Sequence, residues 1–209
     1  PNKDGSYSDR TKFGMMSVII HEVGHNFFPM IVNSDERQWG WMDEGLDTFM
    51  QYLAEQEFGE AYPDAITGLD KYPSRRGAPA AIVPYMAGDQ SFIAPIMSNP
   101  ENVYQLGPNA YAKPATALNI LRETVMGREL FDHAFKTYAQ RWMFKHPTPE
   151  DFFRTMEDAS AVDLDWFWRS WFYTTDYVDI GVGEVKSYYV SNEPTPQMKE
   201  YMAANNLTE

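Results

Sequence analysis

The chain has 209 residues, of which 44% are hydrophobic and 15% aromatic, so it can bury a sizeable core as one domain or as one domain with a tail. Thirty acidic residues against seventeen basic ones give a formal net charge of -13, which opposes binding to nucleic acid or to anionic lipid. No apolar run approaches the roughly twenty residues that a membrane span needs. The absence of cysteine excludes disulfides and thiol metal ligands and is compatible with a cytoplasmic or an exported protein.

The first predicted helix covers residues 13–28, after a polar lead-in over residues 1–11. It contains the segment His21-Glu22-Val23-Gly24-His25. Two imidazoles four residues apart lie on the same face of a helix, so both can bind one metal ion. Glu22 lies one residue further round the helix, where a carboxylate can take a proton from metal-bound water as general base without binding the metal. The segment therefore predicts two ligands and the general base of a catalytic zinc site, and a third ligand must come from elsewhere in the chain.

The second predicted helix covers residues 41–58 and carries Glu44 in its first turn, with eighteen residues between His25 and Glu44. If this helix folds back against the first, Glu44 becomes the third zinc ligand and leaves the fourth tetrahedral position open for water. The alternative is that His21 and His25 are core histidines and that Glu44 is an acid placed for the helix dipole. One buried stripe is expected on this helix, formed by Leu46, Phe49, Met50 and Leu53.

One competing class of zinc site is excluded by inspection. A metzincin would have a third histidine six residues after His25, but Ile31 stands at that position. Phe28 also replaces the glycine that the metzincin pattern requires. The third ligand must therefore come from another segment.

Two residues that follow Glu44 are candidates to support the ligand rings. Asp47 and Thr48 lie three and four residues after Glu44, on the same face of the predicted helix. Either could accept a hydrogen bond from a ligand imidazole, and either could equally be a solvated helix residue. For Asp43 and Asp35 we expect no role beyond capping or solvation.

Residues 62–108 carry seven prolines and several glycines, which limits this stretch to short helices and loops. It could form a wall of a substrate cleft or be an irregular surface connector. Further helices are predicted over residues 114–126, 128–144, 149–160 and 163–173. Residues 177–190 alternate enough for a strand or two, and a polar tail follows. The sequence thus predicts a mainly α fold with little strand near the C-terminus.

Water attack on a carbonyl group needs a hydrogen-bond donor for the oxyanion that forms, and a phenol beside the metal can supply it. The chain has thirteen tyrosines, and sequence alone ranks Tyr111 little above Tyr85 or Tyr104. Each of them could also be a packing residue with its hydroxyl at the surface. The remaining histidines, His133 and His146, have no ligand partner at helical spacing, so we expect surface or packing roles for them.

These motifs resemble the gluzincin zinc metallopeptidases of the aminopeptidase N and leukotriene hydrolase family. The resemblance lies in His21-Glu22-x-x-His25, the eighteen-residue gap and Asp43-Glu44-Gly45. Tyr111-Ala112-Lys113 also resembles the family's Tyr-x-Lys-Gly signature, although Pro114 stands where glycine is usual. Residues 148–153 and 165–172 are similar to the family's later helices, so the resemblance covers residues 13–182.

The resemblance implies the C-terminal helical part of a thermolysin-like (gluzincin) zinc peptidase catalytic domain over residues 1–182, followed by a short strand and polar tail over residues 183–209. It implies Zn²⁺ as the cofactor and a peptide or protein as the substrate. The implied zinc ligands are His21, His25 and Glu44, with Glu22 activating water. The tyrosine of the family signature stabilises the oxyanion, which assigns that role to Tyr111.

Aminopeptidase activity is the family's commonest activity and depends on a Gly-x-Met-Glu-Asn segment upstream of the zinc motif. This chain lacks that segment, and Gly14-Met15-Met16-Ser17 is only a superficial echo of it. We expect an upstream part of a longer protein to carry it, and we expect low or no activity from this chain alone. The alternatives are an endopeptidase or a divergent member, an epoxide hydrolase that uses the same zinc site, and a non-catalytic scaffold, against which the intact Glu22 argues.

Overall fold

The computed structural model describes residues 1–63, 76–178, 180–187 and 192–207. The chain divides into two compact units, Pro1–Tyr177 and Val178–Glu209. The first unit is helical, and the described residues contain no β-strand, in agreement with the predicted mainly α class. Its longer helices are α1 (Asp9–Gly24), α2 (Leu46–Ala61), α4 (Lys113–Ile120), α5 (Arg128–Trp142) and α6 (Pro149–Ser160). Its shorter helices and turns are η1 (Asn26–Ile31), η2 (Trp41–Gly45), η4 (Pro79–Ile82), α3 (Val83–Met86), η5 (Gln90–Phe92), η6 (Pro100–Asn102), η7 (Gly107–Ala112), η8 (Leu121–Val125), α7 (Asp165–Trp168) and η9 (Arg169–Tyr173).

Helix α1 begins earlier and ends earlier than the sequence predicts. It begins at Asp9 because the Ser8 side chain accepts a hydrogen bond from the backbone N–H of Thr11, which caps the first turn. It ends at Gly24, and the π-helical turn η1 that follows has non-helical backbone angles at Phe28 and Pro29. Proline has no backbone N–H to continue a helical ladder, so the predicted helix over 13–28 is wrong at its C-terminal end.

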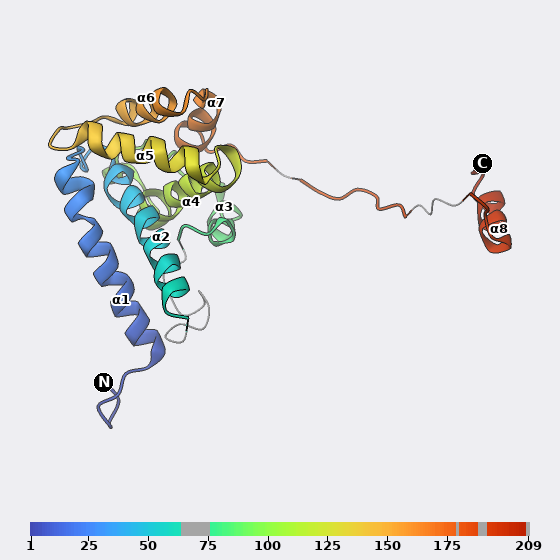
Figure 1. The fold of residues 1–209 in the computed structure, drawn as a ribbon, viewed down its shortest axis with the longest axis horizontal. Helices are drawn as coiled ribbons and strands as arrows, with labels where there is room; N and C mark the ends of the chain where they lie inside the picture. Colours follow the sequence, from blue (N-terminus) through green and yellow to red (C-terminus); the bar gives the residue numbers. More distant parts are fainter. Residues whose placement is uncertain (64–75, 179, 188–191, 208–209) are drawn as a thin grey trace. The chain divides into compact units, whose positions relative to one another are not determined.

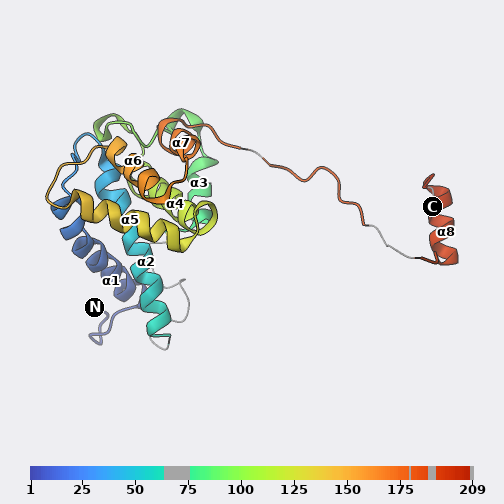
Figure 2. The same ribbon diagram turned by 45° about the horizontal axis from the view of Figure 1, so that its top comes forward.

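Helix α2 packs side by side with α1, as Figures 1 and 2 both show, and the turn η2 leads directly into it. The apolar stripe predicted for this helix is only partly confirmed, because Leu46 and Phe49 are buried, Leu53 is partly buried and Met50 is exposed. A second buried row is polar and has four-residue spacing: Asp47, Gln51 and Glu55. The amide of Gln51 donates to the backbone oxygen of Ser17 in α1 at 3.1 Å and to Glu55 Oε1 at 2.8 Å. The interface between α1 and α2 is therefore held partly by buried hydrogen bonds.

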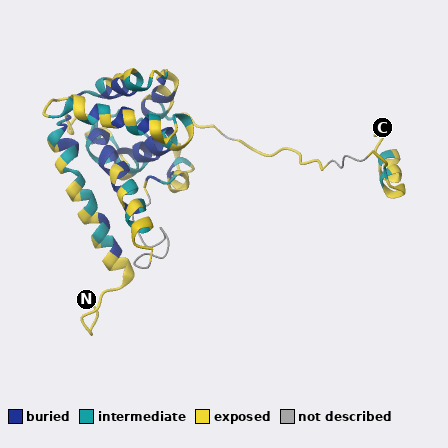
Figure 3. Ribbon diagram, in the orientation of Figure 1, coloured by how far each residue is buried: buried dark blue, intermediate teal, exposed yellow. Residues whose placement is uncertain are grey.

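The main hydrophobic core lies among η2, α2, α4, α5, α6 and η9, where the buried residues of Figure 3 concentrate. Aromatic rings fill much of it. Trp41 of η2 lies 4.8 Å from the Phe172 ring and 5.7 Å from the Phe152 ring. The Phe152 ring lies 4.8 Å from that of Tyr138, and α5 packs closely along α6. This core holds the turn that carries Glu44 against the C-terminal helices of the unit.

The helices predicted over 128–144 and 149–160 are confirmed, because their ends carry local signals. Gly127, with φ of 83°, stops the preceding turn η8 just before α5. Thr148 and Asp151 form a capping box at the start of α6. The proline-rich stretch 62–108 contains only short helical turns in its described part, as predicted, and residues 64–75 lie outside the described residues.

The second unit contains α8 (Pro196–Ala204), which the sequence did not predict within the polar tail. Thr195 caps this helix by accepting a hydrogen bond from the backbone N–H of Met198. The strand predicted over 177–190 is absent from its described residues, while residues 179 and 188–190 lie outside them. Alternating apolar residues there are exposed, and an extended segment without a neighbouring strand is not stable as a β-structure. None of the helices in the described ranges has the length and hydropathy needed to cross a membrane.

Candidate metal centre and catalytic site

Three side chains from two elements meet at one point between α1 and η2. The His21 Nε2 atom lies 3.1 Å from His25 Nε2 and 3.1 Å from Glu44 Oε2. The His25 Nε2 atom lies 3.4 Å from the same Glu44 oxygen. The second helical segment folds back against the first, as the predicted zinc site requires. The structure thus brings the three predicted ligand residues together as a nearly equilateral triangle of donor atoms.

This triangle has the dimensions of one face of a tetrahedral zinc site. Nitrogen and oxygen ligands that lie about 2.0–2.1 Å from zinc in tetrahedral geometry are separated from one another by about 3.3–3.4 Å. The observed separations of 3.1–3.4 Å fall close to that value. All three groups are partly buried, and a set of two imidazoles and one carboxylate is a typical catalytic donor set for zinc. The residues present therefore fit the metal.

The outward-facing nitrogen of each imidazole has its own partner. His21 Nδ1 lies 2.7 Å from Asp47 Oδ2, and His25 Nδ1 lies 2.9 Å from the backbone oxygen of Phe28. Asp43 Oδ1 lies 3.0 Å from the same His25 nitrogen. Such partners fix the tautomer and the orientation of a metal-binding ring, leaving Nε2 to face the metal. Asp47 is thus placed beside a predicted ligand, whereas the sequence left its role open.

Thr48 does not support a ligand ring. Its hydroxyl is buried and has no hydrogen-bond partner among the described residues. Successive side chains of a helix are about 100° apart, so when Asp47 points at α1 its neighbour Thr48 points elsewhere. The described residues therefore give no support for the predicted contact between Thr48 and a ligand imidazole.

A glycine inside the predicted metal-binding motif makes the contact of Asp47 with His21 possible. A Cβ atom built on Gly24 would lie 1.8 Å from Asp47 Oδ1 and 2.9 Å from Asp47 Cγ. Any other residue at this position would push the Asp47 carboxylate away from α1. Glycine lowers the stability of a helix interior, so its presence in α1 has a packing reason.

The protonation equilibria reflect the close packing of these charges in the metal-free protein. Hydrogen bonding to Asp47, and then to Glu44, raises the pKa of His21 to about 10. Burial, and then the neighbouring Glu44 carboxylate, raises the pKa of Asp43 to about 7. The pKa of Glu44 is lowered because hydrogen bonds from His21 and Tyr111 outweigh its burial. A divalent cation at the triangle would relieve the repulsion among the carboxylates.

Tyr111 is the predicted oxyanion donor that the structure places at the triangle. Its ring stacks on the His21 ring with 5.8 Å between centroids, and its hydroxyl donates a hydrogen bond to Glu44. Gly45 allows this approach, because a Cβ atom there would lie 2.6 Å from Pro114 Cγ and 2.9 Å from the Ala110 backbone oxygen. The proline that replaces the usual glycine of the signature lies in the first turn of α4 and packs on η2.

The other candidate tyrosines lie elsewhere. Tyr85 belongs to a small separate cluster with Ile82 and Ile93. Tyr104 is 78% exposed and stacks on Phe92. Burial, followed by the hydrogen bond to Glu44, raises the pKa of the Tyr111 hydroxyl above its usual range, so it is present as a proton donor at neutral pH.

Glu22 lies on α1 directly after His21 and its side chain is exposed. Its carboxylate is therefore accessible to water. The expectation that Asp43 has only a capping or solvation role is wrong, and sequence reasoning missed Arg76. Asp43 contacts His25, and the guanidinium of Arg76 lies over the Tyr111 ring. No spacing rule connects either contact to the metal-binding motif, since both depend on how separate segments fold together.

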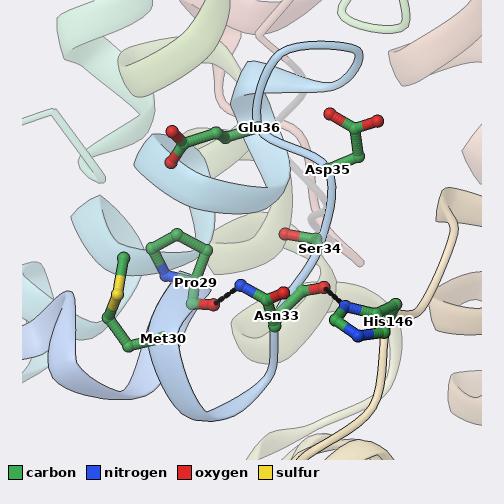
Figure 4. A pocket seen from close by; sticks show the side chains of 7 residues that line it. All are labelled: Pro29, Met30, Asn33, Ser34, Asp35, Glu36 and His146. Carbon is green, nitrogen blue, oxygen red and sulfur yellow. Dashed lines mark hydrogen bonds between the residues drawn. The ribbon is translucent and has the colours of Figure 1, made fainter.

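A pocket of about 450 Å³ lies between η1, the loop that follows it and His146, as Figure 4 shows. The amide of Asn33 donates to the Pro29 backbone oxygen, and the His146 ring contacts the Asn33 backbone oxygen at 3.0 Å. His146 is exposed, which agrees with its predicted surface role. The pocket is lined by Pro29, Met30, Asn33, Ser34, Asp35, Glu36 and His146. None of the residues predicted for zinc binding or catalysis lines it, so it is separate from the triangle.

Comparisons with known proteins find a family match that covers most of the chain. A model of the peptidase family M1 domain matches residues 3–171. Aminopeptidase N of Lactococcus lactis subsp. lactis is 22% identical over 74% of this chain and 18% of its own length. Aminopeptidase M1-D of Oryza sativa subsp. japonica is 24% identical over 85% of this chain and 20% of its own length. Glutamyl aminopeptidase of Sus scrofa is 24% identical over 89% of this chain and 19% of its own length. The chain thus spans about a fifth of the length of these relatives.

Proposed function

This chain belongs to peptidase family M1, and from that premise we propose that the full-length protein is a zinc-dependent aminopeptidase that hydrolyses peptides or proteins. The observation that carries the proposal is the triangle of His21 Nε2, His25 Nε2 and Glu44 Oε2, with edges of 3.1–3.4 Å. These three residues would hold Zn²⁺. When bound, Zn²⁺ would act as a Lewis acid, which lowers the pKa of water toward neutrality and polarises the substrate carbonyl.

The residues around the triangle have separate roles in this proposal. The Glu22 carboxylate accepts a proton from the attacking water and later returns a proton to the leaving amine. The Tyr111 hydroxyl donates a hydrogen bond to the carbonyl oxygen as negative charge develops on it. Asp47 and the Phe28 backbone oxygen keep the two imidazoles oriented, because each contacts the Nδ1 atom of one ring.

The aminopeptidase subtype rests on the relatives, several of which are named aminopeptidases. The described residues contain no feature that favours an endopeptidase or an epoxide hydrolase over an aminopeptidase. A scaffold without turnover is disfavoured by the accessible Glu22 beside three convergent donor atoms, since a scaffold needs no general base.

The proposal is tested by the variant Glu22→Gln in the full-length protein. We expect the variant to retain zinc and to lose about 100-fold or more in the hydrolysis of an amide substrate with a free amino terminus. Glu57→Gln is a matched control, because Glu57 is an exposed glutamate on α2. Undiminished hydrolysis by Glu22→Gln would contradict the proposed mechanism.

The subtype needs a second substrate. We expect acetylation of the substrate's amino terminus to abolish cleavage by the wild-type protein, because an aminopeptidase recognises the free amine. Equal cleavage of the free and acetylated forms would instead indicate an endopeptidase on the same zinc site.

A further inference from the structure

The guanidinium of Arg76 is linked to the metal centre through one aromatic ring. Its central carbon lies 4.6 Å from the centroid of the Tyr111 ring. This distance is well inside the roughly 6 Å limit of a cation–π contact. The Tyr111 ring in turn stacks on His21, 5.8 Å away. Arg76 therefore contacts the predicted oxyanion donor without contacting a predicted metal ligand in the described structure.

The backbone of Arg76 is fixed to the same helix that follows Tyr111. The Thr116 hydroxyl donates to the Arg76 backbone oxygen at 3.0 Å. The Asn119 amide donates to the Gly77 backbone oxygen, also at 3.0 Å. Both donors are buried residues of α4, and the bond from Asn119 is itself buried and shielded from water. The starting point of the Arg76 side chain is thus set relative to Tyr111.

The glycine after Arg76 makes this attachment possible. A Cβ atom on Gly77 would lie 2.5 Å from Tyr52 Cγ and 2.9 Å from Tyr52 Cβ, positions on the rigid part of that side chain. Only glycine therefore allows the segment to lie this close to α2. The segment lies against both α2 and α4, the helices that directly follow the turns η2 and η7, which carry Glu44 and Tyr111.

Arg76 also differs in charge from the groups around it. Glu22, Asp43, Glu44 and Asp47 make the centre acidic, and the whole chain has a formal net charge of -13. Within the described residues no carboxylate pairs with the exposed Arg76 guanidinium. Its positive charge is consequently available to the face of the Tyr111 ring.

We propose that Arg76 is a positioning residue for peptide hydrolysis, which holds the Tyr111 ring in its working orientation through the cation–π contact. This inference rests on the proposed function. Arg76 acts through Tyr111, so its contribution appears in the transition state and leaves substrate binding nearly unchanged. Lysine keeps the charge but lacks the planar group that stacks on a ring, so it replaces arginine only in part.

The first test is a double-mutant cycle in the full-length protein. We expect Arg76→Gln to lower kcat about tenfold with KM within about twofold, as a partly exposed cation–π contact would allow. In a Tyr111→Phe background the same change lowers kcat by less than about twofold, because the hydroxyl through which Arg76 acts is gone. Arg76→Lys recovers part of kcat. The control is Arg154→Gln, an exposed arginine on α6 whose loss leaves kcat unchanged.

Several outcomes would overturn the inference. Equal losses from Arg76→Gln in the wild-type and Tyr111→Phe backgrounds would show that Arg76 acts independently of the hydroxyl. A loss confined to KM would make Arg76 a substrate-binding residue. A Tyr111→Phe variant with full activity would remove the group through which Arg76 is said to act.

A second measurement does not depend on turnover. With fluorotyrosine incorporated, Tyr111 gives a ¹⁹F resonance that is assigned by its absence in Tyr111→Phe. We expect Arg76→Gln to shift and broaden this resonance, and Arg154→Gln to leave it unchanged. An unshifted resonance would overturn the inference even if the protein proved to be a zinc peptidase, whereas a shifted resonance in a protein without peptidase activity would locate the failure in the proposed function.

Discussion

The interface between α1 and α2 differs in the chemistry of its buried side chains from the aromatic core that includes α5 and α6. Between α1 and α2 the buried side chains include Ser17, Asp47, Gln51 and Glu55, while Phe13 is the buried apolar residue of α1. Beneath α5 and α6 the buried groups are aromatic and aliphatic, with rings 4.6–6.5 Å apart. Apolar burial stabilises a fold, whereas buried polar groups cost free energy unless they are partnered. We infer that the core supplies stability and that the α1–α2 interface gives up stability to orient the metal centre.

The largest expected effect separates the two regions by damaging the core. Phe152→Ala removes a fully buried ring that contacts Trp41 and Tyr138, and we expect it to lower the free energy of unfolding by about 3–5 kcal/mol. Zinc affinity of the folded protein should stay within about threefold of wild type. Urea unfolding and zinc titration measure the two quantities. Phe144→Ala is the control, since Phe144 is 80% exposed. A large loss of zinc affinity at little cost in stability would refute the division.

The next effect concerns the charges between α1 and η2 in the metal-free protein. Because the folded-state pKa of His21 is raised from 6.5 to about 10, its protonated form stabilises the fold. That contribution is complete below pH 6.5 and is lost as the pH rises toward 10. We expect the free energy of unfolding to fall by about 2 kcal/mol over this interval, allowing for the solvent that reaches the ring. Urea unfolding at several pH values measures it, and His21→Gln should flatten the dependence. A free energy of unfolding that rises between pH 6.5 and pH 10 would contradict the inferred stabilisation of protonated His21 by Asp47 and Glu44.

The smallest expected effect is a loss of zinc affinity when the carboxylate partner of the His21 imidazole is removed. Asp47→Asn keeps the size of the side chain but loses the negative charge 2.7 Å from His21 Nδ1. We expect zinc to bind about 10–100-fold more weakly, because such partners orient a ligand ring and raise its basicity. Competition with a chelator gives the affinity. Asp158→Asn, an exposed aspartate on α6, should change nothing, and an unchanged affinity in Asp47→Asn would remove Asp47 from the metal centre.

The triangle of His21, His25 and Glu44 was largely predictable because its parts are fixed by local spacing. His21 and His25 share a helix face whatever the rest of the chain does. To place Glu44 beside these histidines, the prediction needed only one further assumption, that a second helical segment folds back on the first. Gly24 and Gly45 were signals that sequence reasoning left unused, since glycine in a helical segment usually has a packing reason.

Contacts between separate segments were not predictable in the same way. Asp43 reaches His25, and Arg76 reaches Tyr111, only after the proline-rich stretch and the π-helical turns adopt their folded paths. Helices with caps, such as α6 after Thr148, follow from local sequence. The strand predicted over 177–190 could not be derived from local sequence, because a stable strand needs a neighbouring strand and local alternation does not reveal whether one is present.

The central claim is that His21, His25 and Glu44 hold one zinc ion, and equilibrium dialysis with metal analysis tests it most directly. We expect one zinc per chain in the wild-type protein and at least about 100-fold weaker binding in Glu44→Gln, with helical circular dichroism retained. Asp163→Asn is the control, because Asp163 belongs to a separate cluster of acidic residues with Glu157 and Asp165. Unchanged zinc affinity in Glu44→Gln, or loss of zinc in Asp163→Asn alone, would contradict the account.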